Sequence, residues 1–197
     1  MLLYDSDVSG NCYKVRLLLA LLGLEYERYP MDVVDRSNRR EVLGHLNPGL
    51  RVPTLVLDDG RPLGESGAIL WYLGEGTPFV PTDPFERAKV LQWMFFEQYS
   101  HEPYVAVARF WLTKGIAVDP ETLAERQRLG YLALDALESH LAGHEFLVDE
   151  RYSIADIALF AYTHVADEGG LDLSGYPVIR AWLERVAAQP GHVSIDA

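Results

Sequence analysis

Cysteine is nearly absent from this chain of 197 residues, which contains only Cys12. A single cysteine excludes an internal disulfide and a zinc site built from several cysteines. It also excludes thiol redox chemistry that requires a second, resolving cysteine in the same chain. This composition suits a reducing compartment.

Long apolar runs are absent as well. No window approaches the roughly 18 consecutive apolar residues of a membrane-spanning helix, and the N-terminus lacks the basic region and cleavage site of a secretory signal. We therefore expect a cytoplasmic protein with no membrane partner. Apolar residues make up 49% of the chain, which is enough to form a core in one large domain or two small ones.

Basic residues are few relative to acidic ones. The chain has 17 Lys and Arg against 29 Asp and Glu, a formal net charge of -12 at pH 7. This charge repels nucleic acid and anionic membranes, so neither is expected as a partner. A site for an anionic ligand must then carry local positive charge. Arg39, Arg40 and Arg51 are candidates, although Arg39 and Arg40 fit a merely solvated face equally well.

The segment 47–70 organises the rest of the chain. Val52-Pro53 leads into an apolar strand, and its proline supplies no backbone donor and can hold a cis peptide bond in a tight turn. Asp59-Gly60 is a two-residue hairpin signal that reverses the chain. One extended backbone edge beside Val52 is therefore expected to remain open for pairing with a peptide-like ligand.

Glu65-Ser66 follows the hairpin, at the point where an apolar-periodic segment begins. We predict that Ser66 is the N-cap of a helix, and that its hydroxyl and the first-turn amides bind an anion such as a carboxylate. Glu65 would then meet an ammonium group. Together with the open edge at Val52, these groups predict a site for a small zwitterionic peptide.

Two motifs in this segment carry a family resemblance. Val52-Pro53-Thr54-Leu55, followed by Glu65-Ser66-Gly67-Ala68-Ile69, resembles the glutathione-binding half-site of cytosolic glutathione transferases. The resemblance covers nearly the whole chain, and it implies glutathione as co-substrate, an apolar electrophile as second substrate, and a homodimer. It also implies that the peptide bond before Pro53 is cis, so that Val52 presents its backbone to the ligand. The residues predicted to bind glutathione are Arg40, Arg51, Val52, Pro53, Glu65 and Ser66.

The element order predicts two domains. Residues 1–74 are predicted to form strand 2–4, helix 11–22, strand 24–29, a weak helix ending at residue 46, the hairpin, and helix 66–73. This β-α-β-α-β-β-α order is that of an α/β thioredoxin-like domain, with its first two strands parallel. Glycine and proline mark residues 75–84 as a linker.

Residues 85–197 are predicted to form an all-α helical bundle. Asp83-Pro84 and Asp119-Pro120 each place a capping residue before a helix-starting proline. Pro103 is expected to bend or interrupt the first long helix. Ser153 and Asp156 have the spacing of a capping box, which indicates a structural role for both.

The first loop is the predicted site of catalysis, because it ends at a helix N-terminus. Lowering a thiol pKa by two units requires roughly 2.7 kcal/mol. One hydrogen bond to a charged group supplies about 1.5 to 3 kcal/mol, and a helix N-terminus adds about 0.3 to 1. The segment Ser9–Arg16 resembles the active-site segment of serine-type and bacterial Nu-like transferases, which implies that Ser9 first and Asn11 second stabilise the glutathione thiolate. The alternative is that Ser9 only caps the helix.

Cysteine, histidine and aromatic residues are further candidates for chemistry. Cys12 could act as a nucleophile that forms mixed disulfides, or it could be a small core residue. His140 and His144 have a helical spacing but no carboxylate pattern around them, so no metal site is predicted, and they and His101 are expected to be solvated. An aromatic acceptor pocket is predicted at Tyr99, Tyr104 and Trp111.

The sequence thus predicts a glutathione transferase. Two alternatives stay open: a glutathione-dependent disulfide reductase or peroxidase, and a non-catalytic binding module that keeps the fold. The intact set of Ser9, Val52-Pro53 and Glu65-Ser66 argues against the last alternative. The sequence does not identify the electrophile.

Overall fold

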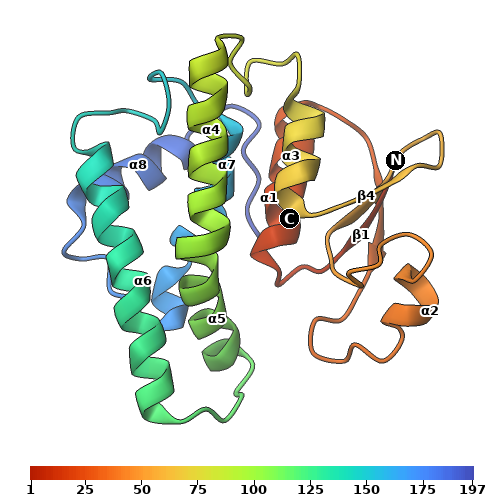
Figure 1. Ribbon diagram of the computed structural model, residues 1–197, viewed down its shortest axis with the longest axis horizontal. Coiled ribbons are helices and arrows are strands. Elements are labelled where there is room, and N and C mark those ends of the chain that lie inside the picture. The colour runs from red at the N-terminus through yellow and green to blue at the C-terminus, as the bar shows by residue number, and fades with distance from the viewer. The chain divides into compact units, whose positions relative to one another are not determined.

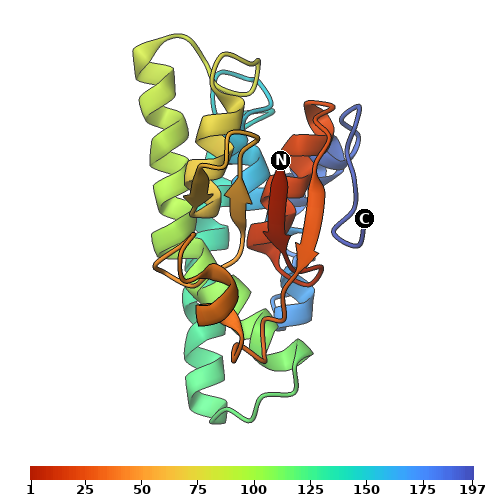
Figure 2. The ribbon, with the colours of Figure 1, turned by 90° about the vertical axis from the view of Figure 1, so that its right-hand side faces the viewer.

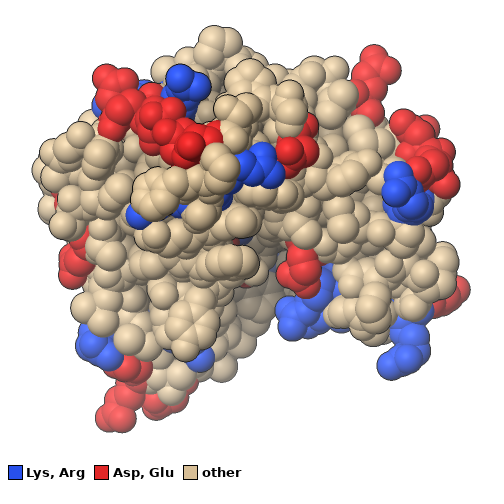
Figure 3. Space-filling view, turned by 45° about the horizontal axis from the view of Figure 1, so that its top comes forward, with Lys and Arg blue, Asp and Glu red and all other residues tan.

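The computed structural model describes all 197 residues, and they divide into two compact units. The first unit contains residues 1–75 and 190–197, and the second contains residues 76–189. None of the helices combines the length and the apolar character that crossing a membrane requires. Figure 3 shows Asp and Glu side chains gathered in small clusters on the displayed face, several with a Lys or Arg beside them.

The first unit is built on a four-stranded mixed sheet in the order β2-β1-β3-β4. β1 and β2 are parallel, as predicted for the opening β-α-β unit, whereas β3 pairs antiparallel with β1 and with β4. The observed element order confirms the predicted thioredoxin-like domain (Figure 1). Its elements are β1 (Leu2–Asp5), α1 (Gly10–Leu21), β2 (Glu27–Pro30), α2 (Arg39–Leu43), β3 (Thr54–Val56), β4 (Pro62–Gly64) and α3 (Ser66–Gly74).

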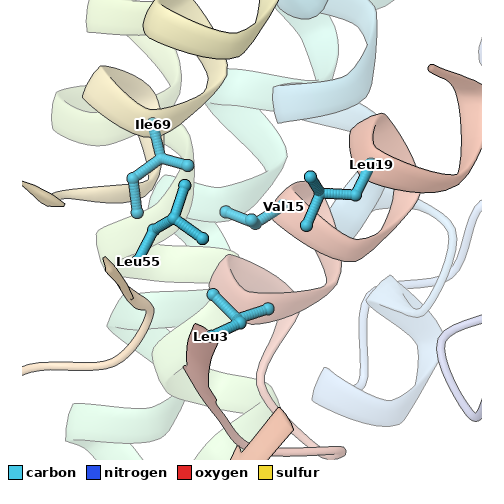
Figure 4. Packing of buried hydrophobic residues seen from close by; sticks show 5 residues of the cluster. All are labelled: Leu3, Val15, Leu19, Leu55 and Ile69. Carbon is cyan, nitrogen blue, oxygen red and sulfur yellow. The ribbon is translucent and has the colours of Figure 1, made fainter. Parts of the chain in front are cut away.

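The core of this unit joins the sheet to α1 and α3, which pack against each other. Leu3 of β1 and Leu55 of β3 meet Val15 and Leu19 of α1 and Ile69 of α3, and all five side chains are fully buried (Figure 4). Val15 and Leu19 are one helical turn apart, so they share the face that α1 turns toward the sheet. This packing fixes the two helix N-termini that form the candidate site.

The second strand begins later than the sequence predicts. Strand 24–29 was expected, but β2 starts at Glu27, whose amide donates to the carbonyl of Met1 at 2.9 Å. The amide of Leu24 instead donates to the carbonyl of Leu19 at 2.9 Å and closes the end of α1. The helix end therefore uses residues that an apolar pattern assigns to the strand.

The last residues also differ from expectation. The helical domain was predicted to reach residue 197, but residues 190–197 cluster with the first unit. The reason is polar: Arg16 of α1 and Arg28 of β2 donate to tail carbonyls, at 2.5 Å to Ile195 and 3.2 Å to Ala197. Figure 2 shows this tail running beside β2.

The second unit is helical throughout. α4 packs against α7, and α6 packs against both α5 and α8. Asp83 and Asp119 cap α4 and α6 with side-chain bonds, as predicted, and a proline starts each helix. Its elements are α4 (Pro84–Phe96), the π-helix η1 (Glu97–His101), α5 (Glu102–Thr113), α6 (Pro120–Leu141), α7 (Ile154–Thr163), the 3-10 helix η2 (Ala166–Gly169) and α8 (Pro177–Ala187).

The predicted interruption near Pro103 is present as the π-helix η1, which separates α4 from α5. Its residue His101 was expected to be solvated, and this expectation is wrong. His101 is fully buried, and its Nε2 lies 3.0 Å from the Thr163 hydroxyl of α7. The wider turn of a π-helix brings this ring into the bundle, which a helical spacing of 3.6 residues does not anticipate.

Candidate functional site

Ser9 stands at the N-cap of α1. Its Oγ accepts a hydrogen bond from the backbone amide of Cys12 at 3.3 Å, and its own amide donates to the carbonyl of Ser6 at 3.1 Å. The side chain is half-buried, and its hydroxyl donates to no carbonyl or carboxylate; the thiol of Cys12 is the group beside it that its hydrogen bond stabilises. Ser9 therefore caps the helix and still carries a proton that can be donated to an anion.

Asn11 connects the two helix N-termini of the first unit. Its Oδ1 accepts from Lys14 Nζ at 2.7 Å and from the Ser66 hydroxyl of α3 at 3.2 Å. An ammonium group can only donate, so the atom that faces Lys14 must be the amide oxygen. The side-chain NH2 of Asn11 consequently points away from these partners as a pair of donors.

The prediction that Ser66 is the N-cap of α3 is wrong. α3 begins at Ser66 itself, and Glu65 occupies the N-cap position without a side-chain bond to the helix. Ser66 is buried, and its hydroxyl donates to Asn11 rather than accepting from its own helix. The physical reason is the turn at Glu65, whose φ of 65° swings the chain before the first helical residue.

Glu65 has an unusual backbone conformation. A positive φ in a residue with a Cβ costs roughly 1 to 3 kcal/mol, and such residues cluster at ligand sites. The backbone carbonyl of Glu65 accepts from the Ile69 amide at 3.0 Å, so α3 holds this geometry in place. The Glu65 side chain is exposed and can reach a ligand that sits on the helix N-terminus.

The peptide bond between Val52 and Pro53 is cis, as predicted. Val52 lies before β3, so its backbone is outside the strand ladder. The Thr54 hydroxyl donates to the carbonyl of Arg51 at 2.8 Å, and Asn47 Nδ2 donates to the Thr54 hydroxyl at 2.9 Å. These side chains hold the segment that presents Val52.

The three arginines near this segment behave differently. Arg40 and Arg51 are exposed, so both remain able to meet an anion in solution. Arg39 is buried and donates to the carbonyls of Leu50 and Asp32, each at 2.9 Å. The idea that Arg39 belongs to a solvated face is therefore wrong, because it fastens the loop after β2 to the turn before Val52.

The environment of Cys12 makes its thiol unreactive. It is fully buried, and burial, together with the charge of Asp5, raises the pKa of its thiol to about 12. The reactive form of cysteine is the thiolate, which this environment suppresses at neutral pH. The core interpretation of Cys12 is the one that its surroundings support.

The three predicted acceptor residues do not form one group. Tyr99 is 84% exposed on η1. Tyr104 and Trp111 lie on α5 and both face the guanidinium of Arg126, whose Cζ is 5.7 Å from the Tyr104 ring centroid and 5.8 Å from that of Trp111. A spacing of seven residues puts Tyr104 and Trp111 on the same side of α5.

Two residues of interest escaped the sequence analysis. Lys14 is 1% exposed, and its ammonium fixes the orientation of Asn11. The available signal was a lysine within the apolar run of α1, where a charged side chain requires a specific partner. Arg126 gave no local signal, because its aromatic neighbours come from another helix.

The histidines of α6 and the following loop interact with each other and with nearby protein groups. The rings of His140 and His144 stack at 4.8 Å. His140 Nε2 lies 3.0 Å from the Leu147 carbonyl, and His144 Nδ1 contacts the Glu150 carboxylate. No group of three or more His, Cys, Asp or Glu is arranged to hold a metal ion.

Family models match both units. The glutathione S-transferase N-terminal domain matches residues 8–75, and the glutathione S-transferase C-terminal domain matches residues 93–190. A solved glutathione S-transferase from Pseudomonas fluorescens shares 50% identity and a TM-score of 0.95, with 98% of each chain covered.

Two curated relatives extend over most of the chain. The disulfide-bond oxidoreductase YfcG of Escherichia coli is 30% identical over 191 residues, which cover 91% of this chain and 87% of the relative. The maleylacetoacetate isomerase of Pseudomonas aeruginosa is 30% identical over 198 residues, covering 96% and 92%. With a polar site at paired helix N-termini and matches of this extent, the chain belongs to the glutathione S-transferase family.

Proposed function

We propose that this protein is a glutathione transferase whose Ser9 and Asn11 stabilise the thiolate of bound glutathione. Glutathione is the co-substrate that membership in the family implies. The observation that carries the proposal is the 3.2 Å bond from the Ser66 hydroxyl to Asn11, because it joins the α3 N-terminus to the α1 N-terminus. One ligand can therefore meet both helices.

The hydrogen-bond pattern supports Ser9 and Asn11 as the donors for the thiolate. The Ser9 hydroxyl accepts from Cys12 N, and a hydroxyl that accepts a hydrogen bond becomes a better donor. Asn11 accepts from Lys14 and Ser66 with its oxygen, so its NH2 group, a pair of donors, is the part of the side chain proposed to face the sulfur. No general base is required, because donors aimed at sulfur lower the pKa of the thiol by stabilising its anion.

The rest of glutathione is assigned to the segment described above. The backbone of Val52 would pair with the cysteinyl unit, and the first-turn amides of α3 at Ser66 would bind a carboxylate. Glu65 would bind the ammonium group, while Arg40 and Arg51 would supply the positive charge that the acidic chain otherwise lacks. Pro53 would hold Val52 in place.

The second substrate is proposed to contact Tyr104 and Trp111. Arg126 between them has no carboxylate within ion-pair distance, and its Nη1 donates only to the Pro103 carbonyl at 3.3 Å. An arginine that stacks on aromatic rings and lacks an ionic partner favours a ligand that carries a carboxylate. We therefore expect an apolar electrophile with an acidic group to be preferred over a neutral one.

Tyr99 fits an interface with a second copy of the chain better than it fits an acceptor pocket. It is exposed together with Phe85 and Phe95, which precede it on α4. With about 100° of rotation per residue, these three positions lie within roughly one quadrant of the helix surface. Such a row of exposed aromatic residues supports the predicted homodimer. The cytoplasmic location remains a prediction from composition.

Glutathione-dependent disulfide reduction is the second candidate, because the Escherichia coli relative is named a disulfide-bond oxidoreductase. The same bound thiolate would attack one sulfur of a disulfide, form a new S–S bond and release the other sulfur as a thiolate. The buried Cys12 would take no part in this exchange.

The test is a turnover panel with glutathione. Purified protein is assayed with a neutral aryl halide, a carboxylate-bearing aryl halide, a hydroperoxide and a small disulfide. The thiolate absorbance of bound glutathione is titrated in parallel. A lowered thiol pKa with turnover of the halides supports the transferase, and turnover of the disulfide alone supports the second candidate. Binding of glutathione without turnover of any substrate would leave a non-catalytic module.

A further inference from the structure

Residues 190–197 and the loop that precedes α1 are joined by side chains that bind both segments. This loop, residues 6–9, lies between β1 and α1 and ends at Ser9. The tail, residues 190–197, follows α8 and packs with the same unit as the loop. Side chains of α1 and β2 lie between the two segments and bind both.

Arg16 makes the main connection. Its Nη2 donates to the tail carbonyl of Ile195 at 2.5 Å and to the loop carbonyl of Asp7 at 3.4 Å. Its Nη1 donates to the Asp5 carboxylate at 2.8 Å and to the loop carbonyl of Ser6 at 3.3 Å. The side chain is 2% exposed, so water cannot readily replace any of these acceptors.

The path from tail to catalytic serine is short. The Ser6 carbonyl that accepts from Arg16 also accepts from the Ser9 amide at 3.1 Å. The backbone of Ser9 is thus joined through one carbonyl to Arg16, and through Arg16 to Ile195. A change at Ile195 therefore acts on the residue that is proposed to donate to the thiolate.

Two further side chains strengthen the contact. The Tyr13 hydroxyl donates to the Val193 carbonyl at 2.8 Å. Arg28 donates to the Asp5 carboxylate at 2.6 Å, contacts the Asp7 carboxylate, and donates to the tail at its last residue. Tyr13, Arg16 and Arg28 thus bind every second residue of the tail, from residue 193 to residue 197. Both arginines also bind Asp5, which directly precedes the loop.

We propose that the tail positions the catalytic loop, with Arg16 as the positioning residue that transmits the constraint. This inference rests on the proposed role of Ser9. Without the tail, the buried guanidinium of Arg16 loses its shortest acceptor and must reorient. The Ser6 carbonyl then shifts, and the Ser9 hydroxyl is no longer held against the glutathione sulfur. Binding through Val52 and Ser66 does not involve this network.

The experiment compares a chain that ends at Gln189 with a full-length control, Asp196→Ala, which alters an exposed side chain of the same tail. The truncated chain is expected to lose about tenfold in kcat, since displacements of about 1 Å near a reacting group have effects of this order or larger. KM for glutathione should stay within about twofold, and the pKa of the bound thiol should rise. Tyr13→Phe, which removes one tail bond and is expected to fold, should show a smaller change in the same direction.

A purely structural tail gives a different result. In that case truncation lowers the melting temperature, while kcat and the thiol pKa match those of the Asp196→Ala control. Equal values for Tyr13→Phe and wild type in both measurements would also contradict the proposal, even if the truncated chain fails to fold.

Failure of the enzyme proposal can be distinguished from failure of this one. Amide hydrogen exchange of residues 6–12 is measured without glutathione in all four proteins. Faster exchange in the truncated chain and in Tyr13→Phe supports the coupling between tail and loop, whether or not the protein turns over any substrate. Unchanged exchange overturns it. A full-length protein that does not lower the thiol pKa rejects the role of Ser9 alone.

Discussion

Ser9 and Ser153 occupy the same position in two helices and have opposite surroundings. Ser153 caps α7: it is buried, its Oγ accepts from the Ala155 amide at 3.2 Å, and its hydroxyl donates to the Asp156 carboxylate at 2.9 Å. Ser9 caps α1, accepts from one amide, and is half-buried, with no carboxylate bound to its hydroxyl. The Ser153 hydroxyl is bound to a buried carboxylate, whereas the Ser9 hydroxyl can still donate to a ligand.

The carboxylate of Asp156 explains the difference. It is fully buried and accepts from the amides of Leu147 and Ser153, from the Ser153 hydroxyl and from the Trp182 indole. Near Ser9 no acceptor of this kind binds the hydroxyl proton. Residue type and helical position therefore specify a cap. The acceptors that surround the hydroxyl decide whether it can also donate to a ligand.

The largest effect is expected for Asp156→Ala. This change leaves two backbone amides, one hydroxyl and the Trp182 indole without their acceptor, so we expect a loss of roughly 3 kcal/mol or more in the free energy of unfolding. The measurement is urea denaturation. The surviving folded enzyme should keep its kcat, and a lowered kcat at unchanged stability would place Asp156 in the chemistry.

Ser9→Ala should change the chemistry of bound glutathione rather than the stability of the fold. Removing a donor to the thiolate, worth roughly 1.5 to 3 kcal/mol, should raise the pKa of bound glutathione by about one to two units. Thiolate absorbance against pH is the measurement, and Ser153→Ala is the matched control, which should lower stability and leave the titration unmoved. If Asn11→Ala shifts the titration and Ser9→Ala does not, then the asparagine amide is the activating donor.

The pH dependence of stability tests the buried cap separately. Burial raises the pKa of Asp156 to about 6, so between pH 4 and 6, roughly, the folded state binds more protons than the unfolded state. The Asp156 contribution to stability is therefore fully present below about pH 4 and is lost as pH rises through about 6. The unfolding free energy of wild type relative to Asp156→Asn should fall across this window. A flat difference would mean that the carboxyl group keeps its ordinary pKa.

Ser66→Ala should weaken glutathione binding by about 1 to 3 kcal/mol, because the hydroxyl supports both the ligand and Asn11. Titration calorimetry measures the dissociation constant. Tyr72→Phe, which removes an exposed hydroxyl farther along the same helix, is a matched control that should leave it unchanged. An unaltered constant for Ser66→Ala removes the residue from the site.

The smallest effect is expected in the second unit, where Arg126 lies against two aromatic rings and has no ionic partner. Arg126→Met should lower kcat/KM for a carboxylate-bearing aryl halide by about 0.5 to 1 kcal/mol, or roughly two- to fivefold, and leave the neutral analogue unaffected. Arg128→Met, which removes an exposed arginine paired with Glu125 on the same helix, is the control. Equal losses for both halides would show that Arg126 contributes packing only.

Much of this molecule follows from local sequence. Asp83-Pro84 and Asp119-Pro120 start their helices where expected, and the capping box of Ser153 and Asp156 is present on both sides. Each capping side chain bonds to backbone amides within one helical turn of itself, so the local sequence is enough to predict the bond. The parallel pairing of the first two strands is equally predictable, because a helical crossover permits little else.

The tertiary structure decided what local patterns leave open. The bond from Ser66 to Asn11 joins positions 55 residues apart, and the bond from Arg16 to Ile195 joins positions 179 apart. Whether a polar side chain caps its own helix or reaches another depends on which donors and acceptors the fold brings within hydrogen-bond distance. The sequence determined the order of helices and strands along the chain and the location of the polar residues. Packing decided which polar residues remained able to bind a ligand, because buried polar groups take partners wherever the fold supplies them.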